Sequence, residues 1–481
     1  MRSSLLKSSL ILTVGKFGSY ALLLARNIIL ARLLTKGDFG LVAAFSMTIT
    51  LFELAGKMSI GMLLVQSKDG DSETLQNTIH STHVALGFLS ALLIACASRP
   101  IAYAFDAPHL AWAFATLAII PIGQSFRHSD NSRMQRSSNF LPTVLTEFLM
   151  QFAMTLAIWP LSYLIYDFTI IIYLLTIKMV TGIFASHYMS SRPYRLSWDK
   201  IQLTKILRFS WPLLINGFVM IGAQQADQFM VGSLINLSNL GTYSVAIMLT
   251  MVPYSFAAHI LGSLLMPTLS LSQDNQERFQ IQYKKALGLT AVIAFSAMAP
   301  LMLIGEHLVT LLYGESFVTA GNVLSILAVA SMIRFLKIVP ATASISKADT
   351  TNQMYSNIFR LTSIPLAFIL YSKFHTIESI AYATVIGEMT SFCISITRLR
   401  FKHNIKLMLT AKPICFVIGA SASTLLLRES SLIDYNIFLD VIVTGIAIGF
   451  VTLVSLKIFP FNSDLLHSAF NSIVAKVRQS H

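Results

Sequence analysis

Eight charged side chains lie deep inside long apolar stretches of this sequence, where a membrane helix rarely tolerates them. They are Arg26, Glu53, Lys57, Asp227, Arg334, Lys337, Arg360 and Glu388. A Lys, Arg or Asp near the middle of a membrane helix costs about 2.5–3.5 kcal/mol, so such a residue usually faces a hydrated cavity or a partner. Cations outnumber acids in the set, and Arg offers bidentate donors to phosphate while Lys offers a point charge. The set favours a site for an anionic head group that carries phosphate.

Four of these cations are the candidate ligands for a diphosphate, namely Arg26, Lys57, Arg334 and Lys337. Arg26 lies about 25 Å along the first apolar stretch at 1.5 Å per residue, and the alternative is that it extends to the outer lipid head groups. Arg334 and Lys337 are one helical turn apart, and the alternative is pairing with Glu388 or Glu306. Arg360 and Lys178 are expected to extend to lipid head groups.

Two acids, Glu53 and Asp227, are candidates for coupling or gating. Glu53 lies one turn before Lys57, and the two either neutralise each other or separate, with Lys57 taking phosphate or Glu53 taking a proton. Asp227 lies among three glutamines between residues 224 and 228. We expect Asp227 to bind a coupling cation, contact sugar hydroxyls or pair with a basic residue of the other half of the chain. An offset of 201 residues aligns it with Arg26, which suggests a gate built on these two charges.

Fourteen apolar stretches contain these residues, and we expect each stretch to cross the bilayer, which needs about 20 apolar residues. They lie near 9–34, 39–66, 75–105, 110–125, 140–164, 168–188, 211–235, 240–270, 283–313, 320–344, 352–371, 377–397, 413–427 and 437–458. Charged residues make up 12% of the chain and its mean hydropathy is +0.67, whereas a soluble domain carries about 25% charge. The predicted fold class is all-α, a polytopic membrane protein of about 14 transmembrane helices.

Basic residues gather in every second loop, which predicts the orientation of the chain. The odd loops hold only Lys36, Arg99, Lys373 and Arg428, while the basic residues of the even loops are densest at 192–208 and 398–412. Because basic loops stay cytoplasmic, both termini are predicted to be cytoplasmic. The net charge of +13 therefore matches anionic lipid head groups, and no basic soluble domain is present to bind nucleic acid.

The chain also contains an internal repeat. Residues 33–41 (LLTKGDFGL) recur as 234–242 (LINLSNLGT), and both copies lie at the first outer turn of a six-helix unit. Repeats six helices apart run in the same direction, so they are parallel repeats. The predicted domains are two six-helix lobes joined by an amphipathic cytoplasmic linker, followed by two further helices and a cytoplasmic tail, with boundaries at 1–188, 189–210, 211–400, 401–460 and 461–481.

Three motifs carry a family resemblance: Leu34-Thr35-x-x-Asp38-Phe39-Gly40, Asp227-Gln228-x-x-x-Gly232, and Leu312-Tyr313-Gly314 followed by Ala320 through Leu327. Over roughly residues 5–400 the chain resembles the polysaccharide flippases of the multidrug/oligosaccharidyl-lipid/polysaccharide exporter superfamily. The resemblance implies a pair of six-helix bundles around a central cavity that opens alternately to each side. It also implies an undecaprenyl-diphosphate-linked oligosaccharide as substrate, held by cations of the cavity, in the bacterial inner membrane.

Other functions remain open at this point. A cation-coupled multidrug exporter of the same fold is expected to have mainly acidic cavity residues, and a peptidoglycan-precursor flippase would also bind a diphosphate. An enzyme is disfavoured because the outer loops are short and no catalytic or nucleotide-binding motif is present. We expect no cofactor and no metal. The expected partners are the lipid-linked substrate, membrane lipids and other polysaccharide-assembly proteins, and the chain is expected to be a monomer.

Overall fold

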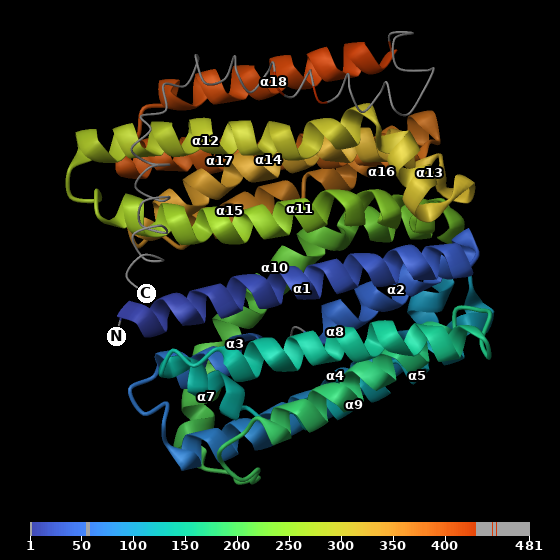
Figure 1. Ribbon diagram of the computed structural model, residues 1–481, viewed down its shortest axis with the longest axis vertical. Coiled ribbons are helices and arrows are strands. Elements are labelled where there is room, and N and C mark those ends of the chain that lie inside the picture. The colour runs from blue at the N-terminus through green and yellow to red at the C-terminus, as the bar shows by residue number, and fades with distance from the viewer. Residues whose placement is uncertain (1, 54–57, 430–444, 446–448, 450–481) are drawn as a thin grey trace. The chain divides into compact units, whose positions relative to one another are not determined.

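The structure is a computed structural model that describes residues 2–53 and 58–429, with 445 and 449 as isolated positions. Throughout these residues the regular structure is helical (Figure 1). Ten of the described helices are long and apolar enough to cross a membrane, or eleven if one bent pair counts as a span. The all-α, multi-pass prediction is confirmed. The predicted stretch 437–458 falls almost entirely outside the described residues.

The chain divides into two compact units, Met1–Ser244 and Val245–His481. The helices that begin in the first unit are α1 (Arg2–Leu33), α2 (Lys36–Glu53), α3 (Met58–Gln66), α4 (Glu73–Ala104), η1 (Pro108–Leu110), α5 (Ala111–Thr116), α6 (Ile119–Ser125), α7 (Asp130–Arg136), α8 (Leu141–Ser162), α9 (Ile170–Tyr188), α10 (Lys200–Leu234) and α11 (Leu237–Ser270). Helix α11 continues into the second unit. The predicted lobe boundaries remain a prediction.

The second unit continues with α12 (Gln276–Leu303), α13 (Gly305–Tyr313), η2 (Glu315–Phe317), α14 (Ala320–Ser346), α15 (Thr351–Arg360), α16 (Ser363–Phe374), α17 (Ile377–His403) and α18 (Met408–Glu429). Helix α14 is central, because it packs against α12 and α17 (Figure 1). Helix α12 also contacts α18, and α15 and α16 both lie against α17. Helices α12, α15 and α17 therefore all contact α14, which carries Arg334 and Lys337.

In the first unit, α8 packs between α1 and α9 (Figure 1). Helix α4 packs against α5 and α6. Helix α10 contacts α2, α3 and α4. At the junction of α3, α4 and α10 lies a small apolar core, made of Ile60, Leu63, Leu64, Leu75, Ile79 and Ile206. These contacts bring the charged residues of α1, α2 and α9 within one helical bundle.

Several predicted spans are not single helices. The stretches 110–125, 283–313 and 352–371 each fall on two helices or more. Between α15 and α16, Pro365 lacks the N–H that would bond to the carbonyl of Leu361, so the helix breaks there. The pair Pro108–Ser125 and Asp130–Arg136 is bent by 50°. Apolar length alone predicted continuous spans, whereas these backbone breaks divide them.

The predicted linker 189–210 is partly anchored to the first unit. Asp199 caps α10, accepting from the amide of Gln202 at 2.8 Å, and the helix then runs unbroken from Lys200 to Leu234. Ile206 is buried in the apolar core, while Trp198 and Ile201 are exposed. Lys205 pairs with Asp69, and hydrogen bonds from Lys205 and Ser67 lower the pKa of Asp69 to about 2.

Candidate functional site

Glu388 on α17 is the centre of a buried charge cluster in the second unit. Its carboxylate forms ion pairs with three cations, Arg334 and Lys337 of α14 and Arg360 of α15. Lys337 Nζ lies 3.0 Å from Glu388 Oε2, and Arg360 Nε lies 2.9 Å from Oε1. Arg334 Nε donates to the same Oε1 atom. Lys337 also donates to Ser391 Oγ at 3.0 Å. The cluster therefore ties α14, α15 and α17 together.

This cluster decides between alternatives that the sequence left open. Arg334 and Lys337 pair with Glu388, whereas Glu306 lies 3.8 Å from Arg428. The expectation that Arg360 extends to lipid head groups is wrong, because its side chain is buried and paired with Glu388. Binding of a diphosphate by Arg334 and Lys337 remains a prediction, and their observed partner gives them a structural role.

Arg26 of α1 lies in the first unit with neutral partners. Its Nη1 atom donates to Gln151 Oε1 at 2.8 Å and lies 2.8 Å from Met154 Sδ, both on α8. An arginine bonded to an amide oxygen keeps its full charge, so it can still attract an anion.

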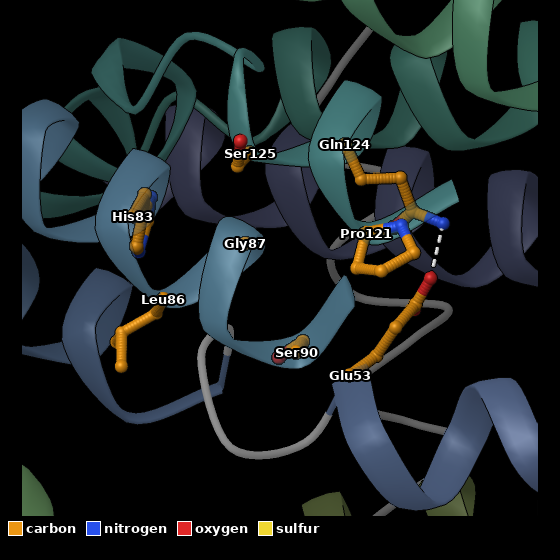
Figure 2. Close-up of a pocket in the computed structure, with 8 residues that line it drawn as sticks. All are labelled: Glu53, His83, Leu86, Gly87, Ser90, Pro121, Gln124 and Ser125. Atoms are coloured by element: carbon orange, nitrogen blue, oxygen red, sulfur yellow. Dashed lines mark hydrogen bonds between the residues drawn. The ribbon is translucent and has the colours of Figure 1, made fainter. Parts of the chain in front are cut away.

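Glu53, at the end of α2, lines a small cavity between α2, α4 and α6 (Figure 2). Gln124 Nε2 donates to Glu53 Oε1, and His83 lies on the α4 wall. The volume of about 30 Å³ has room for about two water molecules. The lining residues are Glu53, His83, Leu86, Gly87, Ser90, Pro121, Gln124 and Ser125. Lys57, the predicted partner of Glu53, lies outside the described residues.

A wider group of charges surrounds this cavity. Lys178 of α9 lies within electrostatic range of Arg26, Glu53, Arg127 and Glu147, and Arg127 in turn interacts with both acids. Lys178 was assigned to lipid head groups, but it lies among these interior charges instead. The group contains more cations than acids, so it leaves a surplus of positive charge inside the first unit.

Sequence reasoning missed two members of this group, Arg127 and Glu147. Glu147 lies within the predicted stretch 140–164, so the criterion that found the other intramembrane acids also applies to it. Arg127 follows the end of stretch 110–125 and gave no such signal. It joins the group because the chain bends between α6 and α7.

Asp227 on α10 is buried and accepts a hydrogen bond from Tyr243 Oη at 3.1 Å. The hydrogen bonds of Arg26 go to Gln151 and Met154 of α8 instead. Their coupling or gating role stays a prediction. Near Asp227, an apolar cavity of about 310 Å³ lies between α2, α4 and α10, with Gln225 on its wall.

The described helices, ten of which are long and apolar enough to cross a membrane, define a multi-pass membrane protein. Residues 29–321 match the family described as "Polysaccharide biosynthesis protein". The match covers more than half of the chain, which therefore belongs to this family of polysaccharide biosynthesis proteins.

Curated relatives agree with this family. The chain is 25% identical over 349 residues to the lipopolysaccharide biosynthesis protein WzxC of Escherichia coli (strain K12), an alignment that covers 70% of this chain and 69% of that protein. It is 21% identical over 325 residues to the succinoglycan biosynthesis transport protein ExoT of Rhizobium meliloti (strain 1021), covering 66% of this chain and 65% of that protein.

Solved structures show the fold. The lipid II flippase MurJ in an inward closed conformation matches with a TM-score of 0.73 at 12% identity, covering 93% of this chain and 98% of that one. An inward-facing multidrug resistance MATE family transporter matches with a TM-score of 0.64 at 15% identity, covering 80% and 94%. At such identities the likeness concerns the fold alone.

Proposed function

We propose that this protein translocates an undecaprenyl-diphosphate-linked oligosaccharide across the bacterial inner membrane, for the assembly of a surface polysaccharide. Family membership and the polysaccharide-assembly relatives support this function. Transport then proceeds by alternating access, without a chemical step, in a chain whose termini both face the cytoplasm. The charge of the loops supports this orientation.

The single observation that carries the substrate class is the surplus of positive charge inside the first unit. Arg26, Arg127 and Lys178 lie within electrostatic range of one another or of the same two acids, Glu53 and Glu147. A diphosphate carries about two negative charges and accepts bidentate hydrogen bonds from arginine. We assign the first contact with the diphosphate to Arg26, because its described hydrogen bonds go to neutral atoms that leave its charge available.

Glu53 is proposed as the coupling residue of the same site. It lies beside a cavity large enough for water, with Gln124 and His83 on the walls (Figure 2). A carboxylate that reaches water inside a membrane protein is able to exchange a proton during the transport cycle. Because Lys178 and Arg127 both interact with Glu53, its protonation would raise the positive charge presented to the substrate.

The test is a deletion strain complemented with variants, in which undecaprenyl-diphosphate-linked glycan and surface polysaccharide are both measured. We expect the deletion to accumulate lipid-linked glycan and to lose surface polymer. Arg26→Ala should lower surface polymer by at least about tenfold, a loss of about 1.4 kcal/mol or more in transition-state stabilisation, while Arg26→Lys retains part of the activity. Arg32→Ala, an exposed cation of the same helix, is the matched control.

Two results would overturn this function. Unchanged glycan and polymer in the deletion strain would remove the polysaccharide substrate, and a simultaneous rise in sensitivity to small cationic drugs would identify a multidrug exporter. Accumulation of the peptidoglycan precursor instead of the polysaccharide repeat unit would identify a precursor flippase.

A further inference from the structure

The two copies of the repeated turn adopt the same capped helix start. Before α2, Thr35 Oγ1 accepts from the backbone amide of Asp38 at 3.1 Å. Before α11, Asn236 Oδ1 accepts from the backbone amide of Asn239 at 2.8 Å. In each copy the cap residue lies three positions before its donor and five before a glycine. Similar side-chain caps therefore place Gly40 and Gly241 at equivalent points of the first helical turns.

These two glycines bring the copies into backbone contact inside the first unit. A β-carbon on Gly40 would lie 1.7 Å from the carbonyl oxygen of Leu237, and one on Gly241 would lie 2.4 Å from that of Lys36. Gly40 and Gly241 differ by 201 residues, and so do Lys36 and Leu237. Each copy thus contacts the other with the same pair of positions, as in an isologous two-fold interface. We call this contact the glycine seam.

Beyond the seam, α2 borders an open space together with α4 and α10. The apolar cavity of about 310 Å³ is lined by Thr48 and Phe52 of α2, by Phe105 of α4 and by Gln225 and Phe229 of α10. Thr48 lies eight residues after Gly40, about 12 Å along the helix. A close backbone contact at the start of α2 is therefore followed, further along the same helix, by a cavity instead of packed side chains.

We propose that the glycine seam is the closed outer seal of the transport route and that it opens in each transport cycle. The outer position follows from the loop charges, and the proposal rests on the proposed transport function. Two glycines make a seam that fits closely without interdigitated side chains, so its surfaces part without repacking. A side chain at either position would collide with backbone and hold the seam apart.

The experiment measures access to the cavity and needs no knowledge of the substrate. In a protein whose Cys96, Cys393 and Cys415 are replaced by alanine, Thr48→Cys reports from the cavity wall, and Gln225→Cys is a second reporter. A membrane-impermeant methanethiosulfonate reagent is applied to spheroplasts, which expose the outer face, and to inside-out vesicles. Gly40→Ala and Gly241→Ala are compared with Gly262→Ala of α11, where a β-carbon would have no atom within 4 Å.

We expect Gly40→Ala and Gly241→Ala to raise labelling of the cysteine at position 48 from the outer face at least fivefold, with no change for Gly262→Ala. Labelling that rises only from the inner face would overturn the outer seal. Alanine variants that are labelled and transport like the parent would overturn the seam itself.

If the alanine variants do not reach the membrane, a second experiment tests the seal in protein with both glycines intact. A seal that opens in each cycle predicts slow, complete labelling of the cysteine at position 48 from outside at 37 °C. The proposal would be overturned if the cysteine at position 48 were not labelled from outside in the folded protein but did react after the protein was unfolded. If labelling behaves as expected but the deletion strain shows no change in polysaccharide, the seal stands and the substrate assignment falls. If labelling contradicts the seal but the deletion strain accumulates lipid-linked glycan and loses surface polymer, the seal is wrong and the substrate assignment stands.

Discussion

At the scale of single residues, Glu388 shows how charges are accommodated inside a membrane bundle. Its carboxylate has no exposed surface and forms ion pairs with Arg334, Lys337 and Arg360. Burying a charge without a partner is far more costly than burying a hydrogen-bonded pair. The carboxylate therefore allows three cations to lie at the centre of the second unit.

Replacement of this carboxylate should destabilise the protein strongly. Glu388→Gln leaves three buried cations without their counter-charge, and breaking a buried pair costs about 3–5 kcal/mol. We expect less folded protein in the membrane and a lower unfolding temperature in detergent. Glu315→Gln, at an exposed acid of the same unit, is the control. Adding Arg360→Gln should restore part of the loss, and a single variant as stable as the control would contradict the role of the cluster.

Glu53 leads to a prediction about energy coupling. If it exchanges a proton in its cavity, transport by the parent protein in proteoliposomes should be accelerated by a pH gradient. Glu53→Gln cannot ionise, so its transport should be slower by about tenfold, which corresponds to about 1.4 kcal/mol, and should no longer respond to the gradient. Glu73→Gln, an exposed acid at the start of α4, should behave like the parent. A gradient response that persists in Glu53→Gln would exclude this residue.

At the scale of elements, Asp349 joins the turn before α15 to the end of α17. Its carboxylate accepts from Thr351 Oγ1 at 2.6 Å and lies 2.9 Å from Lys402 Nζ and 3.3 Å from His403 Nε2. Burial by itself raises the pKa of Asp349, but hydrogen bonds from Thr351, Lys402 and His403 outweigh it and lower that pKa well below its usual range. The ionised carboxylate therefore stabilises the folded state.

The sign of this shift predicts the pH dependence of stability. A depressed pKa in the folded state contributes stability above the unfolded value of about 3.9, and this contribution is lost as the pH falls below it. Asp349→Asn should lower the free energy of unfolding by about 1–3 kcal/mol at pH 7. The difference from the parent should stay constant down to pH 5 and shrink below pH 4. Thermal unfolding in detergent measures it, with the exposed Asp274→Asn as control, and a difference that grows in acid would contradict the assignment.

Helix breaks extend the internal repeat beyond the turn seen in the sequence. Ser138 and Ala348 both have a left-handed backbone, with φ of 61° and 58°, and lie 210 residues apart, just before α8 and α15. The same offset pairs Gln124 with Arg334 and Arg127 with Lys337. Gln124 contacts the acid of its unit, Glu53, as Arg334 contacts Glu388. Each unit thus carries a polar cluster at an equivalent position of the repeat.

At the scale of the whole molecule, the loop charges predict how the chain crosses the membrane. Alkaline phosphatase is active only outside the cytoplasm, so fusions after Asp106, Asp167 and His375 should be active. Fusions after Ser138 and Asn404 should be inactive, because basic residues hold these loops in the cytoplasm. The ratio of phosphatase activity to fusion protein measures the orientation. A reversed pattern would place the glycine seam on the cytoplasmic face.

The sequence by itself determined the class of the protein. Apolar length, the sparsity of charge and the alternation of basic loops identify a multi-pass helical membrane protein, because hydrophobicity and charge act on each segment separately. The repeat at residues 33–41 and 234–242 was also visible, since capped turns have local sequence signals. Charged residues inside apolar stretches are also visible in the sequence, and this criterion applies to Glu147 as well.

Only the tertiary structure decided what those charges contact. Glu388 lies 54 residues from Arg334, and Arg26 lies 125 residues from Gln151, so no local spacing specifies either contact. Arg360 and Lys178 were misassigned because position along a helix does not reveal which face is buried. Gly40 and Gly241 could be read as parts of a repeat, but their contact depends on two helix starts that meet in space. Partners of buried charges and close backbone contacts are set by helix packing, which the sequence pattern does not encode one segment at a time.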